Sequence, residues 1–517
     1  MVSQPIRYHR VMTRLDLVIW TLLLLLWLAA NVVLFRGWVR WENITGHLLT
    51  FGILTVLILR EDSNALYSWG ALLLLKKTAP PPAAPDGLRV AMAATYVPQA
   101  EPMEMILKTL DAMVAVRGEH ESWVLDEGDD PTLRAEAERR GVLHFTRKGR
   151  DEYNAVRGRF KSRTKYGNVN AWLAEAGFAR YDIIAQFDSD HAPDPWYLEK
   201  TLGYFSDPRI GYVQGPPEYQ NLDRSWVARG AWEQDHFNKV LQQALNGARS
   251  PLFVGCHNMS RVTALREVGG FADHEADDAL ITRRLLAGGW KGVFVSETLA
   301  QGLAPEDFQG FLKQQYRWAH SLLNLKFFHE GPLLARMPLL VRVAYKLHGT
   351  YYLDGLFASI GLILVCYMVS SGDVPVALAS VRTAAQVFTP VAVMNLIMYL
   401  VKWRYYIHPS HRERLPWRSM LLDLAAKPYY LMAAFKALRG ESKNYVITPK
   451  TRAATKPLLF LIPHALMMTA VAWVAWRSYS EAIPGTAVLR GSLWIWLALE
   501  AALVVAAMLT KTAQKRP

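Results

Sequence analysis

Acidic residues that could bind a cation or take up a proton stand at two places in the middle of this 517-residue chain. Asp188 and Asp190 follow an apolar run, and Asp278 lies in the segment EADDA. Thirty-five residues, 279–313, separate Asp278 from a Gln-x-x-Arg-Trp sequence made by Gln314, Arg317 and Trp318. Paired aspartates can hold Mg²⁺ or Mn²⁺ on a diphosphate, because these hard cations prefer oxygen ligands. The pattern is typical of a sugar-nucleotide site, in which a separate aspartate accepts a proton from a sugar hydroxyl.

A basic segment precedes the first of these acidic pairs. Lys165 opens the sequence KYGN and follows a loop that contains four further cations, Arg157, Arg159, Lys161 and Arg163. Cations at the start of a helix suit a diphosphate, because the helix N-terminus also favours negative charge. We therefore predict that Lys165 contacts the diphosphate, although a solvated basic loop would have the same composition.

Strand and helix patterns alternate from residue 88 onward. Apolar runs at 88–95, 121–126, 183–188 and 210–215 predict strands, and residues 102–115 and 131–140 predict helices. This alternation favours an α/β domain with a mainly parallel sheet. Ligands of such sheets collect at the carboxyl ends of the strands. Thr95-Tyr96, Asp126-Glu127 and Asp188-Ser189-Asp190 all fall at strand ends, so we expect them at one edge.

The composition indicates a membrane protein. Hydrophobic residues make up 51% of the chain, and they are concentrated toward its two ends. Cys256 and Cys366 are the only cysteines and form no CxxC motif, so we expect neither a disulfide framework nor a zinc site. The net charge of +13 is not accompanied by a nucleic-acid recognition motif, so we expect no nucleic-acid partner.

Six apolar runs are candidate membrane spans, at about 15–35, 44–59, 353–370, 384–402, 457–476 and 491–510. Two spans before residue 86 would return the chain to the side on which it began. Positive residues are dense on one side under this scheme, which the positive-inside rule identifies as cytoplasmic; they include Arg7, Arg10, Arg14, Arg60, Lys76, Lys77, Lys511, Lys515, Arg516 and a series between residues 402 and 456.

These signals divide the chain into three regions. Residues 1–85 would be an N-terminal membrane region with two spans, and the proline-rich stretch 78–87 would link it to a cytoplasmic catalytic domain at 86–330. Residues 331–517 would be a C-terminal membrane region with four spans. Amphipathic segments at 311–329, 335–352 and 415–439 are expected at the membrane surface, where such helices can lie in the interface plane.

Several short motifs in the same order resemble the processive membrane glycosyltransferases of family 2, of which cellulose synthase is an example. They are TY at 95–96, DEG at 126–128, KYGN at 165–168, FDSDH at 187–191, ADD at 276–278 and QQYRW at 314–318. The segment YVITPK at 445–450 is similar to the gating loop of cellulose synthases. The resemblance implies a GT-A-type catalytic domain inserted between transmembrane helices, with about six spans, interface helices and a gating loop at 440–452.

The resemblance also implies a role for each matching residue. Asp278 would be the general base. Gln314, Arg317 and Trp318 would hold the donor diphosphate and the terminal acceptor sugar. Thr95, Tyr96, Asp126 and Asp188 would bind the nucleotide, with Lys165 on its diphosphate. Asp188 and Asp190 would bind Mg²⁺ or Mn²⁺, and Tyr445, Thr448 and Lys450 would close over the nucleotide.

The function that follows is an inverting, metal-dependent polymerase. It would extend a β-linked glucan from UDP-glucose and pass the growing polysaccharide across a bacterial inner membrane, with possible periplasmic or accessory export subunits. Motif departures leave alternatives open: FVGCHN at 253–258 and RWAHS at 317–321 differ from the cellulose synthase pattern. The alternatives are a chitin- or hyaluronan-type synthase using an N-acetylhexosamine donor, transfer of one sugar to a lipid carrier, and an inactive export subunit. Because only about seven residues follow the last predicted span, we expect no C-terminal PilZ domain.

Overall fold

The computed structural model describes residues 6–98, 100–234, 237–406, 416–440, 457–481 and 483–513. Its centre is a seven-stranded mixed sheet with strand order β11-β8-β10-β6-β3-β4-β5. The neighbours pair in parallel except β10, which is antiparallel to both β8 and β6. The strands are β3 (Val90–Tyr96), β4 (Glu121–Asp126), β5 (Leu143–Phe145), β6 (Ile183–Phe187), β8 (Ile210–Gln214), β10 (Asn258–Arg261) and β11 (Lys291–Phe294). The predicted α/β class with a mainly parallel sheet is confirmed.

Strand β3 shows why the chain needs apolar residues on both sides of this sheet. Successive side chains of a strand point to opposite faces. Met92 and Ala94 pack in one core with helix α4 (Met103–Val114), whereas Ala91 and Ala93 pack in a second core with helix α6 (Lys165–Trp172). Strands buried on both faces read as continuous apolar runs, and this is how β3, β6 and β8 appear in the sequence.

A small three-stranded sheet holds the segment that follows Asp190. Its order is β7 (Ala192–Pro193), β12 (Ala300–Gly302) and β9 (Glu218–Tyr219). The strands β7 and β12 pair antiparallel, with Ala300 opposite Pro193 and Gln301 opposite Ala192. The pairing places Gly302 against the ring of His191, where a Cβ atom would lie only 2.4 Å from Cε1. The backbone after the acidic pair is therefore fixed by a segment more than a hundred residues away.

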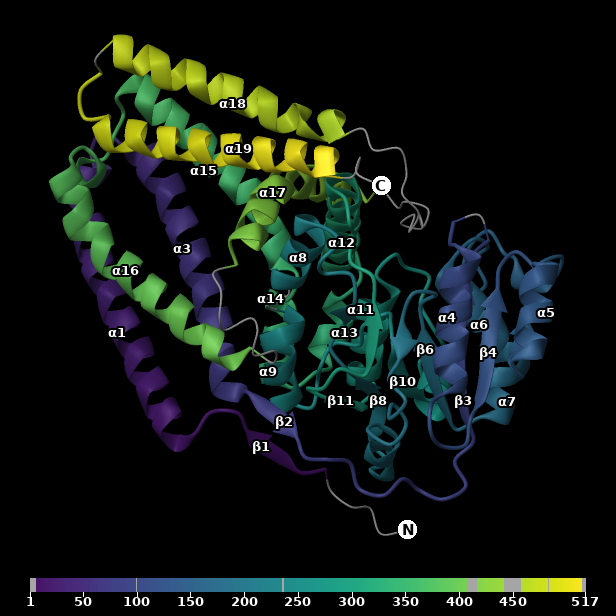
Figure 1. The fold of residues 1–517 in the computed structure, drawn as a ribbon. Helices are drawn as coiled ribbons and strands as arrows, with labels where there is room; N and C mark the ends of the chain where they lie inside the picture. Colours follow the sequence, from purple (N-terminus) through teal and green to yellow (C-terminus); the bar gives the residue numbers. More distant parts are fainter. Residues whose placement is uncertain are drawn as a thin grey trace.

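Long apolar helices lie beside the sheet domain, with α1, α3 and α16 at one side and α18 and α19 across the top in Figure 1. Five helical segments in the described ranges are long and apolar enough to cross a membrane: Arg14–Trp38, Leu339–Ser371, Val381–Tyr405, Leu459–Ser480 and Ala487–Met508. They correspond to α1 (Arg14–Trp38), α14 and α15 (Leu339–Leu347 and Asp354–Ser371), α16 (Val381–Lys402), α18 (Pro457–Ser480) and α19 (Ala487–Ala513). Five of the six predicted runs therefore lie in such helices.

The helix that contains most of the second predicted span, 44–59, has other bounds than predicted. This helix, α3 (Leu48–Gly70), begins four residues later, after a short helix α2 (Trp41–Ile44) and a turn. Arg60, Glu61 and Asp62 then follow the apolar part inside the same helix. These three charges keep α3 outside the set of five, although its 23 residues would extend roughly 35 Å.

A short antiparallel ribbon ties together the two ends of this N-terminal helical region. Strands β1 (Tyr8–Arg10) and β2 (Lys76–Thr78) pair, with Tyr8 opposite Thr78. The chain therefore runs away from the β1–β2 ribbon along α1 and returns to this ribbon along α3 (Figure 1). Buried tryptophans join α1 to α3: the indole of Trp20 donates to Trp69 O at 3.0 Å, and the ring of Trp27 packs edge-on against Trp69 at 5.1 Å.

The three predicted amphipathic segments form helices that pack on other helices. Residues 311–329 fall in α12 (Phe308–Phe328), residues 335–352 include α14, and residues 415–439 form α17 (Trp417–Leu438). Helix α17 buries Leu422, Ala425, Ala426 and Ala433 in one cluster with Phe311, Leu312 and Ala319 of α12. Helix α12 is therefore held between the sheet domain and the helical region.

Candidate active site

The strands β3 and β4 bring Tyr96 and Asp126 side by side, since these two residues are paired in the register of the sheet. Asp126 is fully buried. Its carboxylate accepts hydrogen bonds from Gly128 N at 2.8 Å and Asp130 N at 2.5 Å, and His144 Nε2 lies 3.2 Å away. Burial, followed by the nearby carboxylates of Asp130 and Asp126, raises the pKa of Tyr96 to about 12. The predicted nucleotide-binding residues Thr95, Tyr96 and Asp126 thus share one sheet edge.

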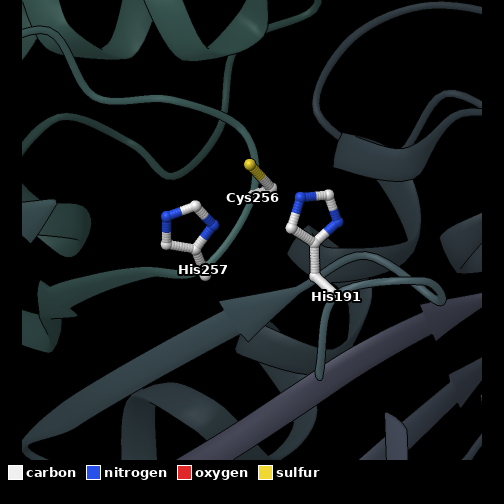
Figure 2. Close-up of side chains that lie close together, drawn as sticks. All are labelled: His191, Cys256 and His257. Carbon is white, nitrogen blue, oxygen red and sulfur yellow. The ribbon is translucent and has the colours of Figure 1, made fainter. Parts of the chain in front are cut away.

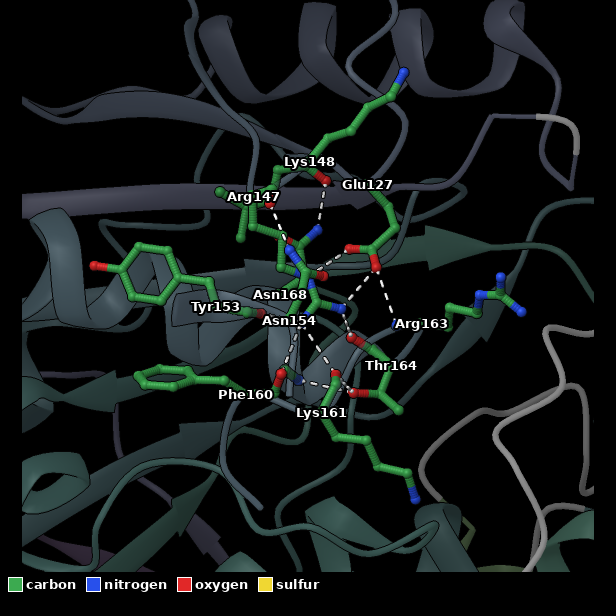
Figure 3. A network of polar contacts seen from close by, with 12 residues as sticks. Glu127, Arg147, Lys148, Tyr153, Asn154, Phe160, Lys161, Arg163, Thr164 and Asn168 are labelled. Atoms are coloured by element: carbon green, nitrogen blue, oxygen red, sulfur yellow. Dashed lines mark hydrogen bonds and ion pairs between the residues drawn. The ribbon is translucent and has the colours of Figure 1, made fainter. Parts of the chain in front are cut away.

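Behind this edge, Arg147 organises the basic loop that leads to Lys165 (Figure 3). The Arg147 guanidinium donates to both carboxylate oxygens of Glu127, at 2.9 and 2.6 Å. It also donates to the carbonyl oxygens of Tyr153, Phe160, Lys161 and Thr164. Arg147 is 1% exposed, so these bonds are shielded from water. One side chain therefore fixes the loop from residue 153 to residue 164 relative to the end of β4.

Helix α6 begins at the end of this loop and presents Lys165 to the acidic pair. The Thr164 hydroxyl caps the helix by accepting from Gly167 N at 3.1 Å. Lys165 Nζ contacts a carboxylate oxygen of Asp188 and the carbonyl oxygen of Gly255. The predicted diphosphate-binding lysine therefore lies between the end of β6 and the loop before β10.

The same Gly255 connects Lys165 to Asp278. Gly255 N donates to Asp278 Oδ2 at 3.1 Å, and Ala279 N donates to Asp278 Oδ1 at 2.6 Å. Asp278 lies in the first turn of α11 (Asp277–Ala287), where a helix N-terminus favours negative charge. Burial nevertheless raises the pKa of the Asp278 carboxyl above its usual range, while the two backbone donors, Lys165 and Arg317 act in the opposite direction. Burial and the neighbouring Asp278 charge also raise the pKa of Asp277.

The Gln-x-x-Arg-Trp sequence lies in α12, whose first turn is capped by Asp307, which accepts from Gly310 N at 2.7 Å. Gln314, Arg317 and Trp318 are partly exposed, and their spacing of three and four residues places them on one face of this helix. Gln315 points elsewhere and accepts from Tyr430 Oη of α17 at 2.6 Å. Since the Arg317 charge acts on Asp278, the exposed face of α12 adjoins the α11 carboxylates.

A divalent cation can be held where β6 ends. Asp188, Asp190 and His191 each offer one ligand atom, and these atoms lie within 4.8 Å of one another. Asp190 is 5% exposed, with Oδ2 accepting from Leu303 N at 3.1 Å and Oδ1 lying 3.1 Å from His191 Nδ1. An ionised carboxylate has about four acceptor positions, so a carboxylate that accepts hydrogen bonds can also bind a metal. The donor set therefore fits the predicted Mg²⁺ or Mn²⁺.

Sequence reasoning identified the acidic and basic residues but not the parts that connect them. Tyr445, Thr448 and Lys450 of the predicted gating loop lie outside the described residues. The backbone of Gly255, which meets both Lys165 and Asp278, was not predicted as part of the site, nor was Arg147. A buried arginine among acidic and loop residues carries no distinguishing signal in a single sequence.

Comparisons with known proteins agree with this arrangement of motifs. Residues 183–407 match the family model described as Glycosyl transferase family group 2. The cellulose synthase catalytic subunit (UDP-forming) of Xanthomonas axonopodis pv. citri is 28% identical over 248 residues, which cover 46% of this chain and 32% of that protein. A probable glucomannan 4-β-mannosyltransferase of Oryza sativa subsp. japonica is 28% identical over 207 residues, which cover 39% of this chain and 37% of that protein. The chain thus spans about a third of the length of these two relatives.

Among solved structures, a mannosyltransferase of Pyrobaculum calidifontis in complex with GDP-mannose and Mn²⁺ matches with a TM-score of 0.48 and 17% identity. The match covers 76% of this chain and 99% of that one.

Proposed function

Residues 183–407 carry a Glycosyl transferase family group 2 domain in a cellulose synthase-like chain, and from this premise we propose that the protein is an inverting, metal-dependent glycosyltransferase that polymerises a β-linked glucan. The donor would be UDP-glucose. The proposal rests on two contacts of Gly255. Its carbonyl oxygen accepts from Lys165, the cation beside the acidic pair, and its N–H donates to Asp278, the carboxylate with a raised pKa.

Asp278 would act as the general base. Displacement at the anomeric carbon needs a group that takes the proton from the acceptor hydroxyl as the new bond forms. A raised pKa makes a carboxylate a stronger base, and the backbone donors Gly255 N and Ala279 N hold its orientation. An inverting reaction is a single displacement, so the chain needs one such base and no nucleophile of its own.

Lys165 and Arg317 would bind the donor diphosphate. Negative charge grows on the leaving group as the glycosidic bond to the donor breaks, and fixed cations stabilise it. Lys165 contacts Asp188 in the described structure, so its ammonium would be shared between this carboxylate and the diphosphate. Thr95, Tyr96, Asp126 and Asp188 would bind the nucleoside part.

Asp188 and Asp190 would hold the divalent cation, Mg²⁺ or Mn²⁺. When bound, such an ion neutralises charge on the diphosphate. Two carboxylates whose ligand atoms lie this close together suit a hard cation of this kind.

The acceptor would lie against the exposed face of α12. Trp318 offers a flat apolar surface to a sugar ring, and Gln314 and Arg317 on the same face can hydrogen-bond to hydroxyl or phosphate oxygens. Tyr445, Thr448 and Lys450 would close over the nucleotide. We propose that the polysaccharide then leaves through the membrane helices that surround α12 and α17.

The proposed location is a bacterial inner membrane with residues 86–330 facing the cytoplasm. The pairing of β1 with β2 supports it, because both ends of the α1–α3 region then lie on the side of the sheet domain. Helix α3 would cross the membrane together with α1, with Arg60, Glu61 and Asp62 near the cytoplasmic boundary. Arg60 Nη2 is 2.8 Å from Asp354 Oδ1, which gives one of these charges a partner.

The test is nucleotide release by the purified full-length chain, followed by analysis of the product. UDP-glucose, UDP-N-acetylglucosamine and GDP-mannose are offered in turn, with Mg²⁺ or Mn²⁺. We expect UDP release from UDP-glucose and a polymer that a β-glucanase digests. The GDP-mannose arm is included because a mannosyltransferase is among the relatives.

Other products would replace the proposal with a defined alternative. A lipid-extractable product carrying one sugar would show transfer to a lipid carrier. A polymer made only from UDP-N-acetylglucosamine would show an N-acetylhexosamine polysaccharide synthase. No nucleotide release with any donor, from protein that still binds UDP, would indicate an inactive export subunit.

A further inference from the structure

A second group of metal-ligating side chains lies beside the acidic pair and shares His191 with it, and the proposed reaction uses neither Cys256 nor His257. His191, Cys256 and His257 each offer one ligand atom, and these atoms lie within 4.8 Å of one another. The three residues are 6%, 7% and 0% exposed. Figure 2 shows the sulfur of Cys256 between the two imidazole rings, with a ring nitrogen of each histidine turned toward it. The rings are nearly parallel, with their centroids 5.6 Å apart.

Each histidine has one ring nitrogen that bonds outward and one that turns toward the Cys256 thiol. His191 Nδ1 lies 3.1 Å from Asp190 Oδ1, and His257 Nε2 lies 3.2 Å from the carbonyl oxygen of Gly215. The other two nitrogens, His191 Nε2 and His257 Nδ1, are buried and turn toward the Cys256 thiol, whose single hydrogen can be donated to only one of them at a time. Buried polar atoms are nearly always satisfied, so two such atoms beside one thiol need an explanation.

We propose that His191, Cys256 and His257 form a second metal site, which takes a borderline-soft divalent cation such as Zn²⁺. Its ligand atoms would be His191 Nε2, Cys256 Sγ and His257 Nδ1, and binding would release the thiol proton of Cys256 to solvent. Three protein ligands leave a fourth position for water, as in many zinc sites.

The partners of the two outward ring nitrogens, a carboxylate and a backbone carbonyl, are those that metal-binding histidines usually have. A ligating histidine usually donates its other N–H to a carboxylate or to a backbone carbonyl, which fixes the tautomer and the ring orientation. Asp190 has this relation to His191, and Gly215 O has it to His257. Gly302 lies directly against the His191 ring, so the ring is also confined by packing.

The ligand chemistry separates this site from the acidic pair. Thiolate and imidazole ligands select Zn²⁺ and similar ions, whereas Mg²⁺ requires oxygen ligands. An ion at Cys256 would also fix the preceding residue, Gly255, whose N–H donates to Asp278 and whose carbonyl accepts from Lys165. The ion would act as a positioning element for the loop 255–257 and would take no part in sugar transfer.

The proposed site differs from the expectation of no zinc site, which rested on the absence of a CxxC motif. His257 follows Cys256 directly in the sequence, but the third ligand, His191, lies just after β6, far from Cys256 along the chain. The pairing of β10 with β6 helps to bring the two segments together.

The experiment measures metal binding by the full chain in detergent. The protein is stripped with a chelator, loaded with Zn²⁺ in the presence of excess Mg²⁺, and analysed by elemental mass spectrometry. We expect about one Zn²⁺ per chain. Loading with Co²⁺ in place of Zn²⁺ should add a thiolate-to-metal charge-transfer absorption. Cys256→Ser and His257→Asn should each lower the Zn²⁺ affinity by more than about 100-fold, because each removes a direct ligand.

Two control variants make the result specific. Cys366→Ser removes the other cysteine, in α15, and should leave Zn²⁺ binding unchanged. Asp188→Asn weakens the hard-cation site but should also keep Zn²⁺. Absence of Zn²⁺ from the loaded wild-type chain, or equal Zn²⁺ in Cys256→Ser and His257→Asn, would overturn the proposal. If the variants fail to fold, a wild-type Co²⁺ spectrum without the thiolate band overturns it as well. Nucleotide release is not part of this test, so failure of the proposed function leaves its outcome intact.

Discussion

At the scale of single residues, the environment of Asp278 combines two opposing influences on its charge. Burial disfavours the ionised carboxylate, whereas two backbone N–H groups, Lys165 and Arg317 favour it. A general base needs both, because it must be ionised when the acceptor arrives and basic enough to take the proton. The Asp278 charge in turn helps burial to raise the pKa of Asp277, the residue before it in the sequence, to about 7.

The first prediction concerns Asp278→Asn, which keeps the shape of the side chain and removes its basicity. The rate of nucleotide release with acceptor present should fall by about 10²–10⁴-fold, the usual contribution of a general base. UDP binding measured by calorimetry should change little, because the predicted nucleotide contacts lie on β3, β4 and β6. Asp86→Asn, at an exposed position of the 78–87 link, serves as the matched control. Equal activity in the two variants would contradict the proposed role.

The second prediction is a pH dependence. The pKa of Asp278 is raised, so its ionised fraction begins to fall at a pH above the value of about 3.9 for a free aspartate. Activity should therefore be full above this raised pKa and be lost as the pH falls through it. Burial and the Asp278 charge raise the pKa of Asp277 to about 7, so Asp277 is protonated while Asp278 titrates, and Asp277→Asn should leave the acid limb of the pH–rate profile in place. An acid limb that moves to lower pH in this variant would show that Asp277 is charged while Asp278 titrates.

At the scale of elements, the loop before α6 depends on one buried ion pair. Arg147 satisfies both oxygens of Glu127 and four loop carbonyls, so its removal would leave several buried acceptors without donors. Lys165 is the first residue of the helix that this loop precedes. The position of Lys165, the proposed diphosphate-binding residue, therefore depends on Arg147, which lies behind it in the loop network.

The third prediction is that Arg147→Gln destabilises the sheet domain by about 3–5 kcal/mol, the usual effect of breaking one partner of a buried pair. Arg134→Gln breaks an exposed contact with Asp129 and should cost about 0–1 kcal/mol. Denaturant unfolding of both variants in detergent, followed by tryptophan fluorescence, gives the comparison. Similar midpoints for the two variants would show that the Arg147 network contributes little.

At the scale of the whole molecule, the ribbon of β1 and β2 closes the N-terminal helical region into a loop that begins and ends beside the sheet domain. Helix α9 (Gln242–Gly247) continues this attachment, because Gly247 lies so close to Leu74 O that a Cβ atom would be 2.2 Å from it. The catalytic region and the helices thus meet through tight backbone contacts as well as through side chains. We expect the sheet domain and the N-terminal helices to keep their relative positions while the proposed polysaccharide is made.

The fourth prediction tests the membrane path of α1 and α3. Single cysteines replace Glu42, an exposed residue of the short helix α2 between α1 and α3, and Asp86, in the 78–87 link, each in a Cys366→Ser background. In sealed inner-membrane vesicles of known orientation, a membrane-impermeant maleimide should label the two positions from opposite sides. Labelling of both positions from the same side would show that α3 does not cross the membrane, and the chain would then have five spans.

Local residue patterns were enough to predict the alternation of strands and helices and to nominate the candidate site residues, because both follow from residue types near one another in the chain. Apolar runs predicted β3, β4 and β6, with Thr95-Tyr96, Asp126 and Asp188 at their ends, and Gln314, Arg317 and Trp318 lie on one helix as their spacing indicates. Long hydrocarbon stretches likewise predicted the membrane helices. The charges at Arg60–Asp62 limited the prediction for α3, because composition alone does not say whether a helix that contains charged residues crosses the membrane.

Contacts between residues far apart in the chain could be found in the folded structure alone. Gly255 joins Lys165 to Asp278, Arg147 joins β4 to the basic loop, and His191 reaches Cys256 and His257, each through contacts between segments far apart in the chain. Such contacts follow from the order of strands in the sheet, above all from the antiparallel insertion of β10 between β6 and β8. Strand order is a property of how the whole chain packs, and no local pattern of residues encodes it.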